Sequence, residues 1–341
     1  MYMLDLRRPY VKRIDLASLM DRTALEFALG GLEIDPRLRQ HATKLAKNAE
    51  SANTIRNYKS NLVAFQRWAE SYGLSPLPAT GVVLALHIAD ADHLTINSHL
   101  VRLSAIAKVH DKLGLPCGRG DYVVKEMVRA YRRVHGSLTH SKRPIRPEQL
   151  RALVRLARRQ PQVLRGLRDA ALMLVQFGGA LRSAELAFNV ADLEFLQNGV
   201  RINLQRSKAD PEGWGQHVII DRGAHNNTCP VRALRKWLNY SGIVSGAVFP
   251  EIHRSGSLTH NALLPRAIYQ IVRSYLKIVT DQFKDYGTHS MRSGWLTSGF
   301  EAGLSDVELL NQSRQKSPQT LLRYLRYADF TKRNLTALIG L

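Results

Sequence analysis

The most informative part of the chain is the segment Thr288-His289-Ser290-Met291-Arg292. On a helix or a helical turn, a spacing of three residues puts His289 and Arg292 on one face. A second arginine lies in Ala180-Leu181-Arg182-Ser183-Ala184-Glu185-Leu186, and Tyr324 follows later in Leu321-Leu322-Arg323-Tyr324. Guanidinium groups bind phosphate oxygens in pairs, imidazole exchanges protons near neutral pH, and a phenol can act as a nucleophile. These side chains together suit attack on a phosphodiester, because the arginines could stabilise the negative transition state.

Each of these residues is ordinary when it is taken alone. In a chain with 49 lysines and arginines, a single arginine is usually a solvated surface charge. A single histidine usually caps a helix, and most tyrosines spaced like Tyr324 and Tyr327 pack against a core. A phenol is also almost wholly protonated at neutral pH, so a nucleophilic tyrosine needs activation. The pattern by itself does not choose between the two tyrosines.

The length and charge of the chain indicate two folded domains and a polyanionic partner. The 341 residues suffice for two ordinary domains, and the apolar content is that of a folded protein. The formal charge of +21 favours nucleic acid. A membrane surface would require a strongly amphipathic basic segment, but the basic residues are dispersed along the chain. We therefore expect no membrane partner.

The cysteines and the N-terminus narrow the class further. Cys117 and Cys229 lie far apart, without CxxC spacing or clustered histidines, so neither a disulfide framework nor a zinc site is predicted. The N-terminal residues lack an apolar signal region, and no apolar run approaches the ~20 residues of a membrane span. We expect an intracellular, soluble protein without a metal.

Residues from about 20 to 135 have helical periodicity. Apolar positions recur every three or four residues in 62–72 and again in 100–110. Proline and glycine interrupt the pattern in 73–78 and 114–118. This pattern predicts a small helical bundle. The candidate helix caps are Ser51, Thr54, Thr95 and Ser104.

The polar, basic and proline-closed stretch 137–147 has the composition of a linker. We therefore expect an N-terminal extension over 1–45, a helical domain over 46–136, this linker, and a second domain over 148–341. In the second domain, a helical run is predicted from Glu148 to about Phe177, followed by a helix carrying Arg182. Alternating apolar residues predict antiparallel strands at 199–204 and 217–221, and helical patterns resume from Pro230. The expected fold is mainly α with a small antiparallel β-sheet.

The order of the chemical motifs has a known counterpart. An LR-x-x-E-L motif, a lysine between two predicted strands, an H-x-x-R box and a later tyrosine resemble the tyrosine recombinase (phage integrase) family. The resemblance covers about residue 46 to the C-terminus. The family positions fall on Arg182, Glu185, Lys208, His289, Arg292, Gln315 and Tyr324. The family spacing selects Tyr324 rather than Tyr327 as the nucleophile.

The N-terminal domain is most similar to that of the Cre-like members of the family. The similarity lies in Ser51-x-x-Thr54, Pro78-Ala79, Thr95-Ile96-x-x-His99-Leu100 and His110-x-x-x-Gly114-Leu115-Pro116. In such enzymes this domain clamps DNA, and the resemblance implies groove-facing positions. These are Thr54, Arg56, Asn57, Thr95 and Ser98 in the first domain and Arg266 and Tyr269 in the second. Arg266 is the candidate for base readout, because arginine matches the guanine edge. For the other positions, an ordinary surface role is equally compatible with the sequence.

Position 315 departs from the family pattern, which has histidine or tryptophan there. A neutral tryptophan serves in Cre-like enzymes, and the amide of Gln315 can offer the same kind of N–H hydrogen bond to phosphate. The alternative is that Gln315 is only a residue on a helix surface. Both interpretations stay open at this point.

The resemblance also implies a mechanism. Tyr324 would attack the scissile phosphate to give a 3′-phosphotyrosyl link, while Lys208 protonates the departing 5′-hydroxyl. Arg182, Arg292 and Gln315 would bind the phosphate, His289 would assist proton transfer, and Glu185 would orient the site. Because one phosphoester is exchanged for another, no ATP, metal or other cofactor is expected.

The resemblance implies particular partners as well. Lys142, Arg143 and Arg146 of the linker would cross the DNA backbone. The partner would be double-stranded DNA with inverted repeats, bound by a chain that is monomeric when free and tetrameric on paired sites. The apolar segment 335–341 could dock into a neighbouring protomer or pack on its own domain.

The preferred hypothesis is a site-specific DNA recombinase that acts through a four-way junction in the cytoplasm, at the nucleoid, with a bacterial, phage or plasmid origin. Three alternatives remain. A type IB topoisomerase would relax supercoils as a monomer, and a catalytically weak or inactive DNA-binding homologue would accommodate Gln315. A purely structural nucleic-acid binder would require the whole Arg, Lys, His, Arg, Tyr series to be accidental.

Overall fold

The computed structural model describes residues 15–30, 32–136, 142–204, 215–325 and 328. The chain divides into two compact units, residues 1–140 and 141–341, and each unit is described by itself. Within the described ranges, no helix combines the length and the apolar character that crossing a membrane requires.

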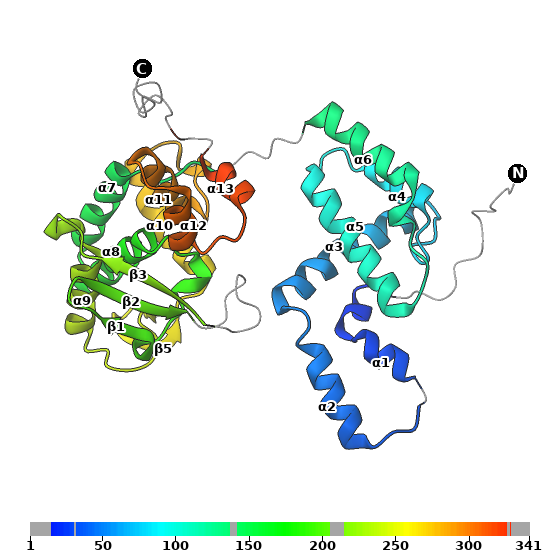
Figure 1. The fold of residues 1–341 in the computed structure, drawn as a ribbon, viewed down its shortest axis with the longest axis horizontal. Coiled ribbons are helices and arrows are strands. Elements are labelled where there is room, and N and C mark those ends of the chain that lie inside the picture. The colour runs from blue at the N-terminus through cyan, green and yellow to red at the C-terminus, as the bar shows by residue number, and fades with distance from the viewer. Residues whose placement is uncertain (1–14, 31, 137–141, 205–214, 326–327, 329–341) are drawn as a thin grey trace, which may run out of the picture. The chain divides into compact units, whose positions relative to one another are not determined.

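Unit 1 is helical. Its helices are α1 (Ala24–Leu29), α2 (Pro36–Lys47), α3 (Ala52–Ser71), α4 (Gly81–Asp90), α5 (Ile96–Leu113) and α6 (Tyr122–His135), with short 3-10 turns at Ser18–Asp21 and Gly118–Gly120. The interruptions predicted at 73–78 and 114–118 separate α3 from α4 and α5 from α6. The predicted helical bundle is therefore confirmed for this part of the chain (Figure 1).

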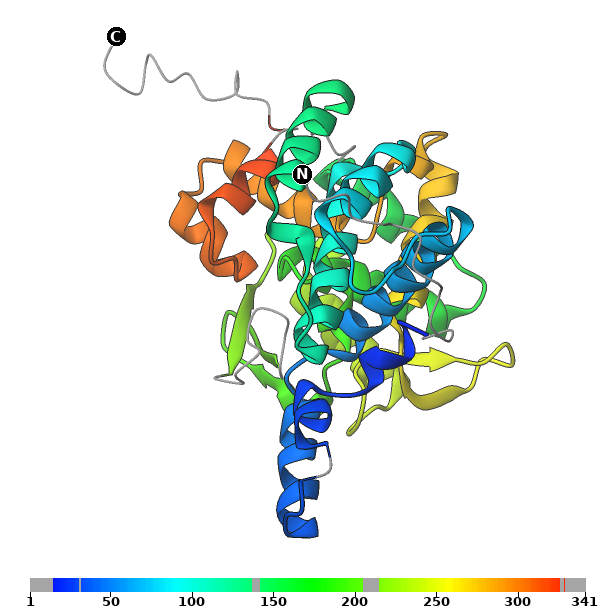
Figure 2. The same cartoon turned by 90° about the vertical axis from the view of Figure 1, so that its right-hand side faces the viewer.

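The apolar stripes of α3 and α5 form the centre of the unit 1 core. Leu62 and Phe65 from α3 and Leu103 and Ile106 from α5 are almost fully buried. Leu16, which lies within the segment predicted to be an N-terminal extension, is buried in the same core. The start of the described part of that segment therefore packs as part of unit 1. Helix α2 projects from the rest of the unit in both views (Figure 1, Figure 2).

Two of the four predicted caps begin helices. The side chain of Ser51 accepts a hydrogen bond from the backbone N–H of Thr54 at the start of α3, and Thr95 does the same for Ser98 at the start of α5. Thr54 lies inside the first turn of α3. The hydroxyl of Ser104 donates to the carbonyl of Leu100 within α5, so neither Thr54 nor Ser104 is a cap.

Unit 2 combines helices with two small antiparallel sheets. Its helices are α7 (Pro147–Arg158), α8 (Val163–Gly178), α9 (Pro230–Ser241), α10 (Pro265–Val279), α11 (Ser290–Glu301), α12 (Asp306–Ser313) and α13 (Pro318–Tyr324). Its strands are β1 (Leu193–Phe195), β2 (Gly199–Leu204), β3 (Gln216–Asp221), β4 (Pro250–Ile252) and β5 (Leu258–Ala262). The predicted mainly α fold with a small antiparallel sheet is confirmed.

The predicted strand pair occurs in the three-stranded sheet. Strand β2 pairs with β1 and with β3, and Ile202 lies opposite Val218 in the β2–β3 register. Val200, Ile202 and Ile220 face the core, which explains their alternating pattern. The sequence did not predict β1 or the β4–β5 pair.

Two helix predictions in unit 2 need correction. The run from Glu148 to Phe177 is two helices, because the chain leaves the helical conformation around Pro161, which cannot donate a backbone hydrogen bond. Arg182 does not lie on a helix. It is extended, with φ −71° and ψ 152°, directly before a short 3-10 turn at Ser183–Leu186.

The described part of the predicted linker packs on unit 2. Ile145 is fully buried in the core of this unit, and its backbone N–H donates to the carbonyl of Ser290 at 2.9 Å. The backbone N–H of Arg143 donates to the carbonyl of Asp285 at 2.8 Å. The polar composition of 137–147 did not predict this packing, because Ile145 is the one apolar residue between Pro144 and Pro147. The segment therefore lies beside the start of α11.

Gly294 allows this close approach, and Gly294→Ala should destabilise unit 2. A Cβ atom at residue 294 would lie 1.9 Å from the carbonyl oxygen of Ile145 and 3.1 Å from the ring of Phe177. Either segment must move, at a cost of about 1–3 kcal/mol. Thermal unfolding should show a lower Tm for Gly294→Ala than for Gly120→Ala, since a Cβ at residue 120 meets open space. An unchanged Tm would contradict the observed packing.

Candidate active site

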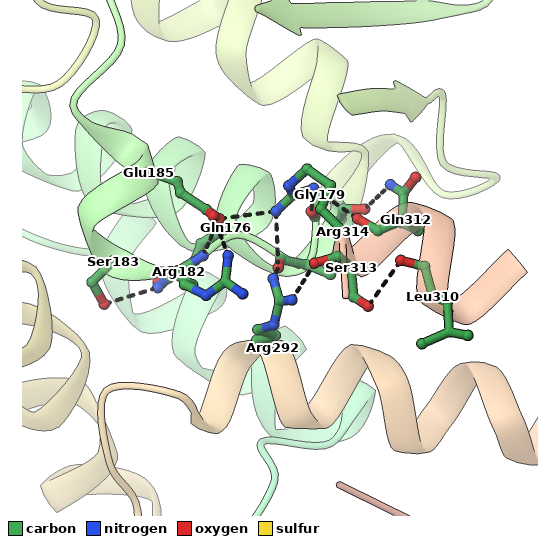
Figure 3. A network of polar contacts seen from close by, with 12 residues as sticks. Gln176, Gly179, Arg182, Ser183, Glu185, Arg292, Leu310, Gln312, Ser313 and Arg314 are labelled. Carbon is green, nitrogen blue, oxygen red and sulfur yellow. Dashed lines mark hydrogen bonds and ion pairs between the residues drawn. The ribbon is translucent and has the colours of Figure 1, made fainter. Parts of the chain in front are cut away.

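Arg182 and Glu185 form a local pair on the turn that follows α8. The carboxylate of Glu185 accepts from the backbone N–H of Arg182 at 2.7 Å and from its Nη1 at 2.5 Å. The side chain of Glu185 is 5% exposed, whereas that of Arg182 is 26% exposed. The glutamate therefore fixes both the backbone and the guanidinium of Arg182, and leaves part of that guanidinium accessible (Figure 3).

A third arginine, Arg314, contacts the other side of Glu185. Its Nη2 donates to Oε2 of Glu185 at 2.9 Å, and its side chain is 5% exposed. Burial alone would raise the pKa of Glu185, but Arg314 and then Arg182 outweigh burial and hold that pKa below its usual range. Glu185 is therefore an anion between two cations, as Figure 3 shows.

Arg292 projects from α11 toward the same group and is 1% exposed (Figure 3). Its Nη1 donates to the carbonyl of Ala180 at 2.6 Å, and its Nη2 donates to the carbonyl of Ser313. Burial, followed by the charge of Arg182, lowers the pKa of Arg292 to about 10, so it stays protonated at neutral pH. The charges of Arg182, Arg292 and Arg314 exceed the single charge of Glu185 by two.

Two residues here have positive φ although they are not glycine. Ala180 has φ 46° and Arg314 has φ 55°. The carbonyl of Ala180 also accepts from Arg314 at 3.4 Å, so one oxygen serves two guanidinium groups. A non-glycine residue in this conformation is under steric strain, which the surrounding contacts must offset.

His289 precedes α11 and is exposed. Its carbonyl accepts from the backbone N–H of Ser293 in the first turn, at 2.9 Å. The hydroxyl of Ser183, next to Arg182, donates to the carbonyl of Thr288 at 3.3 Å. The histidine box and the arginine turn, which are far apart in the sequence, are therefore joined in the structure.

Gln315 follows Arg314 at the end of α12. Its backbone N–H donates to the carbonyl of Leu310 at 3.0 Å. The side-chain Nε2 and Oε1 atoms are both buried, and neither has a hydrogen-bond partner among the described residues. A buried amide without partners is costly, so it is a candidate for binding a ligand oxygen.

Tyr324 is the last residue of α13. The hydroxyl of Thr297 in α11 donates to its carbonyl at 3.1 Å, and its ring packs partly buried against a cluster that contains Leu296, Leu309 and Leu321. Helix α11 therefore supports the tyrosine and supplies Arg292 as well.

Two of the sequence-predicted positions are outside the described residues. Lys208 and the alternative nucleophile Tyr327 are not described, and neither is the segment 335–341. Among the residues that the structure does describe, no group of three His, Cys, Asp or Glu side chains could hold a metal ion.

The predicted DNA-binding residues of unit 1 lie at the N-terminal ends of α3 and α5, at the cap or within the first two turns. The described positions are Thr54, Arg56, Asn57, Thr95 and Ser98. Each helix begins with a hydroxyl pair: Ser51 and Thr54 are 2.9 Å apart, and Thr95 and Ser98 are 3.0 Å apart. Arg56 and Asn57 follow Thr54 along α3, and both residues are exposed.

The predicted basic residues of the linker contact unit 2. Nζ of Lys142 donates to the carbonyl of Lys284 at 2.8 Å. Arg143 lies 3.7 Å from the carboxylate of Asp285, and Arg146 lies 2.9 Å from that of Glu301. These contacts hold the basic side chains on one unit.

The remaining two predicted DNA-binding residues lie on α10. Arg266 is exposed in its first turn. Tyr269 is half-buried, and its hydroxyl donates to the carbonyl of Tyr286 at 3.5 Å.

The sequence did not identify Arg314 as a site residue. Its partner Glu185 lies far away in the sequence, so the pairing could not be predicted from the local pattern. The one available signal was its place after α12, where a chain reversal usually takes glycine.

The chain is similar to known proteins over most of its length, although no family model matches it. The Integrase/recombinase xerD homolog of Selenomonas ruminantium is 31% identical over 309 residues, which cover 89% of this chain and 90% of that relative. The structure of XerH site-specific recombinase bound to palindromic difH substrate has a TM-score of 0.62 at 12% identity, with 99% of both chains covered. A lambda integrase dimer bound to a COC' core site has a TM-score of 0.55 at 15% identity, with coverage of 86% and 95%. These two structures share the fold of this chain.

Proposed function

The chain belongs to the tyrosine recombinase family, and we propose that its catalytic centre is the arginine cluster around Glu185 together with Tyr324. The protein is a site-specific recombinase that cleaves and rejoins DNA. The observation that carries the assignment of the centre is the excess of positive charge at one site. Two guanidinium groups pair with the single carboxylate of Glu185, and Arg292 adds a third that is bonded to backbone carbonyls, so the site is suited to a phosphate whose negative charge increases in the transition state.

We propose that Arg182 and Arg292 bind the scissile phosphate. Arg182 is oriented by Glu185 and is the more exposed of the two. Arg292 is fixed by two backbone carbonyls, so little reorganisation is needed when the phosphate arrives. Paired N–H donors then stabilise the non-bridging oxygens as their charge rises.

The chemical step transfers the phosphate from DNA to Tyr324. The phenol oxygen forms a bond to phosphorus as the bond to the 5′-oxygen breaks, which gives a 3′-phosphotyrosyl link and a 5′-hydroxyl. We propose that Lys208 supplies the proton to this leaving oxygen and that His289 assists proton transfer. In the reverse step a 5′-hydroxyl attacks the phosphotyrosine and restores the phosphodiester, so no external energy source is consumed.

We propose that the Gln315 amide donates to the phosphate, and Gln315→Ala should therefore slow cleavage by roughly 10- to 100-fold. The basis is the buried, unpartnered Nε2 atom, which in this proposal finds its partner in a phosphate oxygen. Single-turnover cleavage of a nicked suicide substrate measures the rate. Gln319→Ala, an exposed glutamine on α13, is the matched control. Equal rates for Gln315→Ala and the unmodified enzyme would instead show that the amide does not bind the phosphate.

We propose that the DNA is held in the manner of Cre-like enzymes. The duplex would contact the N-terminal ends of α3 and α5, the basic side chains of Lys142, Arg143 and Arg146, and Arg266 on α10, with Arg266 reading guanine. Inverted repeats would bind two protomers and paired sites would bind four, with 335–341 joining neighbours. We further propose that the enzyme acts on bacterial, phage or plasmid DNA in the cytoplasm. The +21 charge and the DNA-bound structures of the same fold support the proposed binding to DNA.

One experiment tests the proposed function as a whole. Binding sites are first selected from random duplexes and then rebuilt as suicide substrates with a nick near the cleavage position. The protein should form a covalent adduct in EDTA without ATP, and two intact sites on plasmids should yield recombinants through a four-way junction. Supercoil relaxation without recombinants would identify a topoisomerase-like enzyme, and specific binding without an adduct would identify an inactive homologue.

A further inference from the structure

We infer that Arg314 is a positioning residue of the recombinase site, which offsets the charge of Glu185 and thereby leaves the charge of Arg182 available to the phosphate. This inference rests on the proposed function of the arginine cluster. It concerns a residue that does not itself touch the phosphate, because its guanidinium is directed at Glu185 and at backbone carbonyls (Figure 3).

The contacts of Arg314 link the two segments that form the site. Nη1 donates to the carbonyl of Gly179 at 3.1 Å and to that of Gln312 at 2.7 Å. Nη2 donates to Oε2 of Glu185 at 2.9 Å. One buried side chain therefore joins the turn that carries Arg182 to the end of α12, which carries Gln315.

The backbone at Arg314 makes an incidental role implausible. This residue ends α12 with φ 55°, a conformation in which glycine is least strained. Arginine also loses its hydration and much of its rotamer freedom when it is buried. The backbone strain and the burial of a charged side chain both occur at this one residue. The strong contacts that offset them all lie within the site.

The charges explain what Arg314 contributes. With Arg314, the cluster of Arg182, Arg292 and Glu185 has a net charge of +2. Without it, Glu185 would be balanced by Arg182 alone, and one positive charge would remain for the phosphate. Since low-dielectric surroundings strengthen such charge effects, the loss should appear in the chemical step rather than in DNA binding.

The test uses two variants of the full-length protein on the suicide substrate. Arg314→Gly suits the positive φ, so it should fold, and it should cleave roughly 10- to 100-fold more slowly with a DNA Kd changed by less than about threefold. The double variant Arg314→Gly with Glu185→Gln returns the net charge to +2, so it should cleave faster than Arg314→Gly alone. Arg314→Lys should also retain part of the rate.

The outcomes separate positioning from packing. If Arg314 only filled space, removing a second native group would slow the double variant further, and that result would overturn the inference. A wild-type rate for Arg314→Gly would overturn it as well. The proposed function is judged separately by the adduct of the unmodified protein, so its failure is distinguishable. Circular dichroism and Tm of each variant confirm that the comparison is made between folded proteins.

Discussion

Tyr324→Phe should abolish the covalent protein–DNA adduct while leaving specific DNA binding intact. The substitution removes only the phenol oxygen, which is the atom proposed to bond to phosphorus. Loss of a covalent nucleophile typically costs at least roughly 10⁴-fold in rate, so the adduct should be undetectable on a gel. The ring contacts with Leu296, Leu309 and Leu321 are retained, and the hydrogen bond from Thr297 is made to the backbone, so α13 should stay in place.

Two matched tyrosine variants sharpen this test. Tyr327→Phe removes the alternative phenol, and Tyr240→Phe removes the hydroxyl of an exposed tyrosine on α9 that is not among the predicted site residues. Both variants should form the adduct. If Tyr324→Phe still formed the adduct while Tyr327→Phe did not, the nucleophile would be Tyr327. Gel-shift Kd values for the three variants show whether an absent adduct reflects chemistry or failure to bind.

Local sequence patterns predicted the elements whose buried side chains recur with the period of a helix or a strand. The α3 stripe containing Leu62 and Phe65 and the alternation of Val200 and Ile202 both follow directly from which side chains are buried. Packing between distant segments was not visible in this way. Ile145 stands in a polar stretch, and only the approach of α11 through Gly294 shows why it is buried.

The candidate site was predicted by residue type and order rather than by conformation. Arg182 was expected on a helix, but the bonds from its backbone and side chain to Glu185 favour a tight turn. Such a bond between a side chain and the backbone competes with helical hydrogen bonding, so local propensity gave the wrong element. The pairing of Glu185 with Arg314 depends on the end of α12 packing on Gly179, which is a tertiary contact.

The positive φ values at Ala180 and Arg314 link these observations. Because the carbonyl of Ala180 accepts from both Arg292 and Arg314, its orientation determines where two guanidinium groups lie. The turn at Ala180 places this carbonyl, and the turn at Arg314 returns the chain to it. The strained backbone is therefore located where it orients the arginines.

Arg292→Lys should slow cleavage by roughly 10²- to 10³-fold and also lower stability by about 1–3 kcal/mol. The guanidinium donates to the carbonyls of Ala180 and Ser313 at once, through two nitrogens of a rigid plane. A single ammonium cannot reproduce that geometry, so one carbonyl loses its partner and the cation loses its fixed position. Single-turnover cleavage and urea denaturation measure the two effects separately.

Arg168→Lys is the control that distinguishes chemistry from stability. Arg168 is 5% exposed and donates to Asp169 and to the carbonyl of Pro250, away from the arginine cluster. Its replacement should lower stability to a similar extent but leave the cleavage rate of the folded protein within about threefold, because this side chain lies outside the site. If both variants slowed cleavage equally, the effect of Arg292→Lys would be a consequence of destabilisation. A rate loss confined to Arg292→Lys would locate the phosphate at the guanidinium held by Ala180 and Ser313.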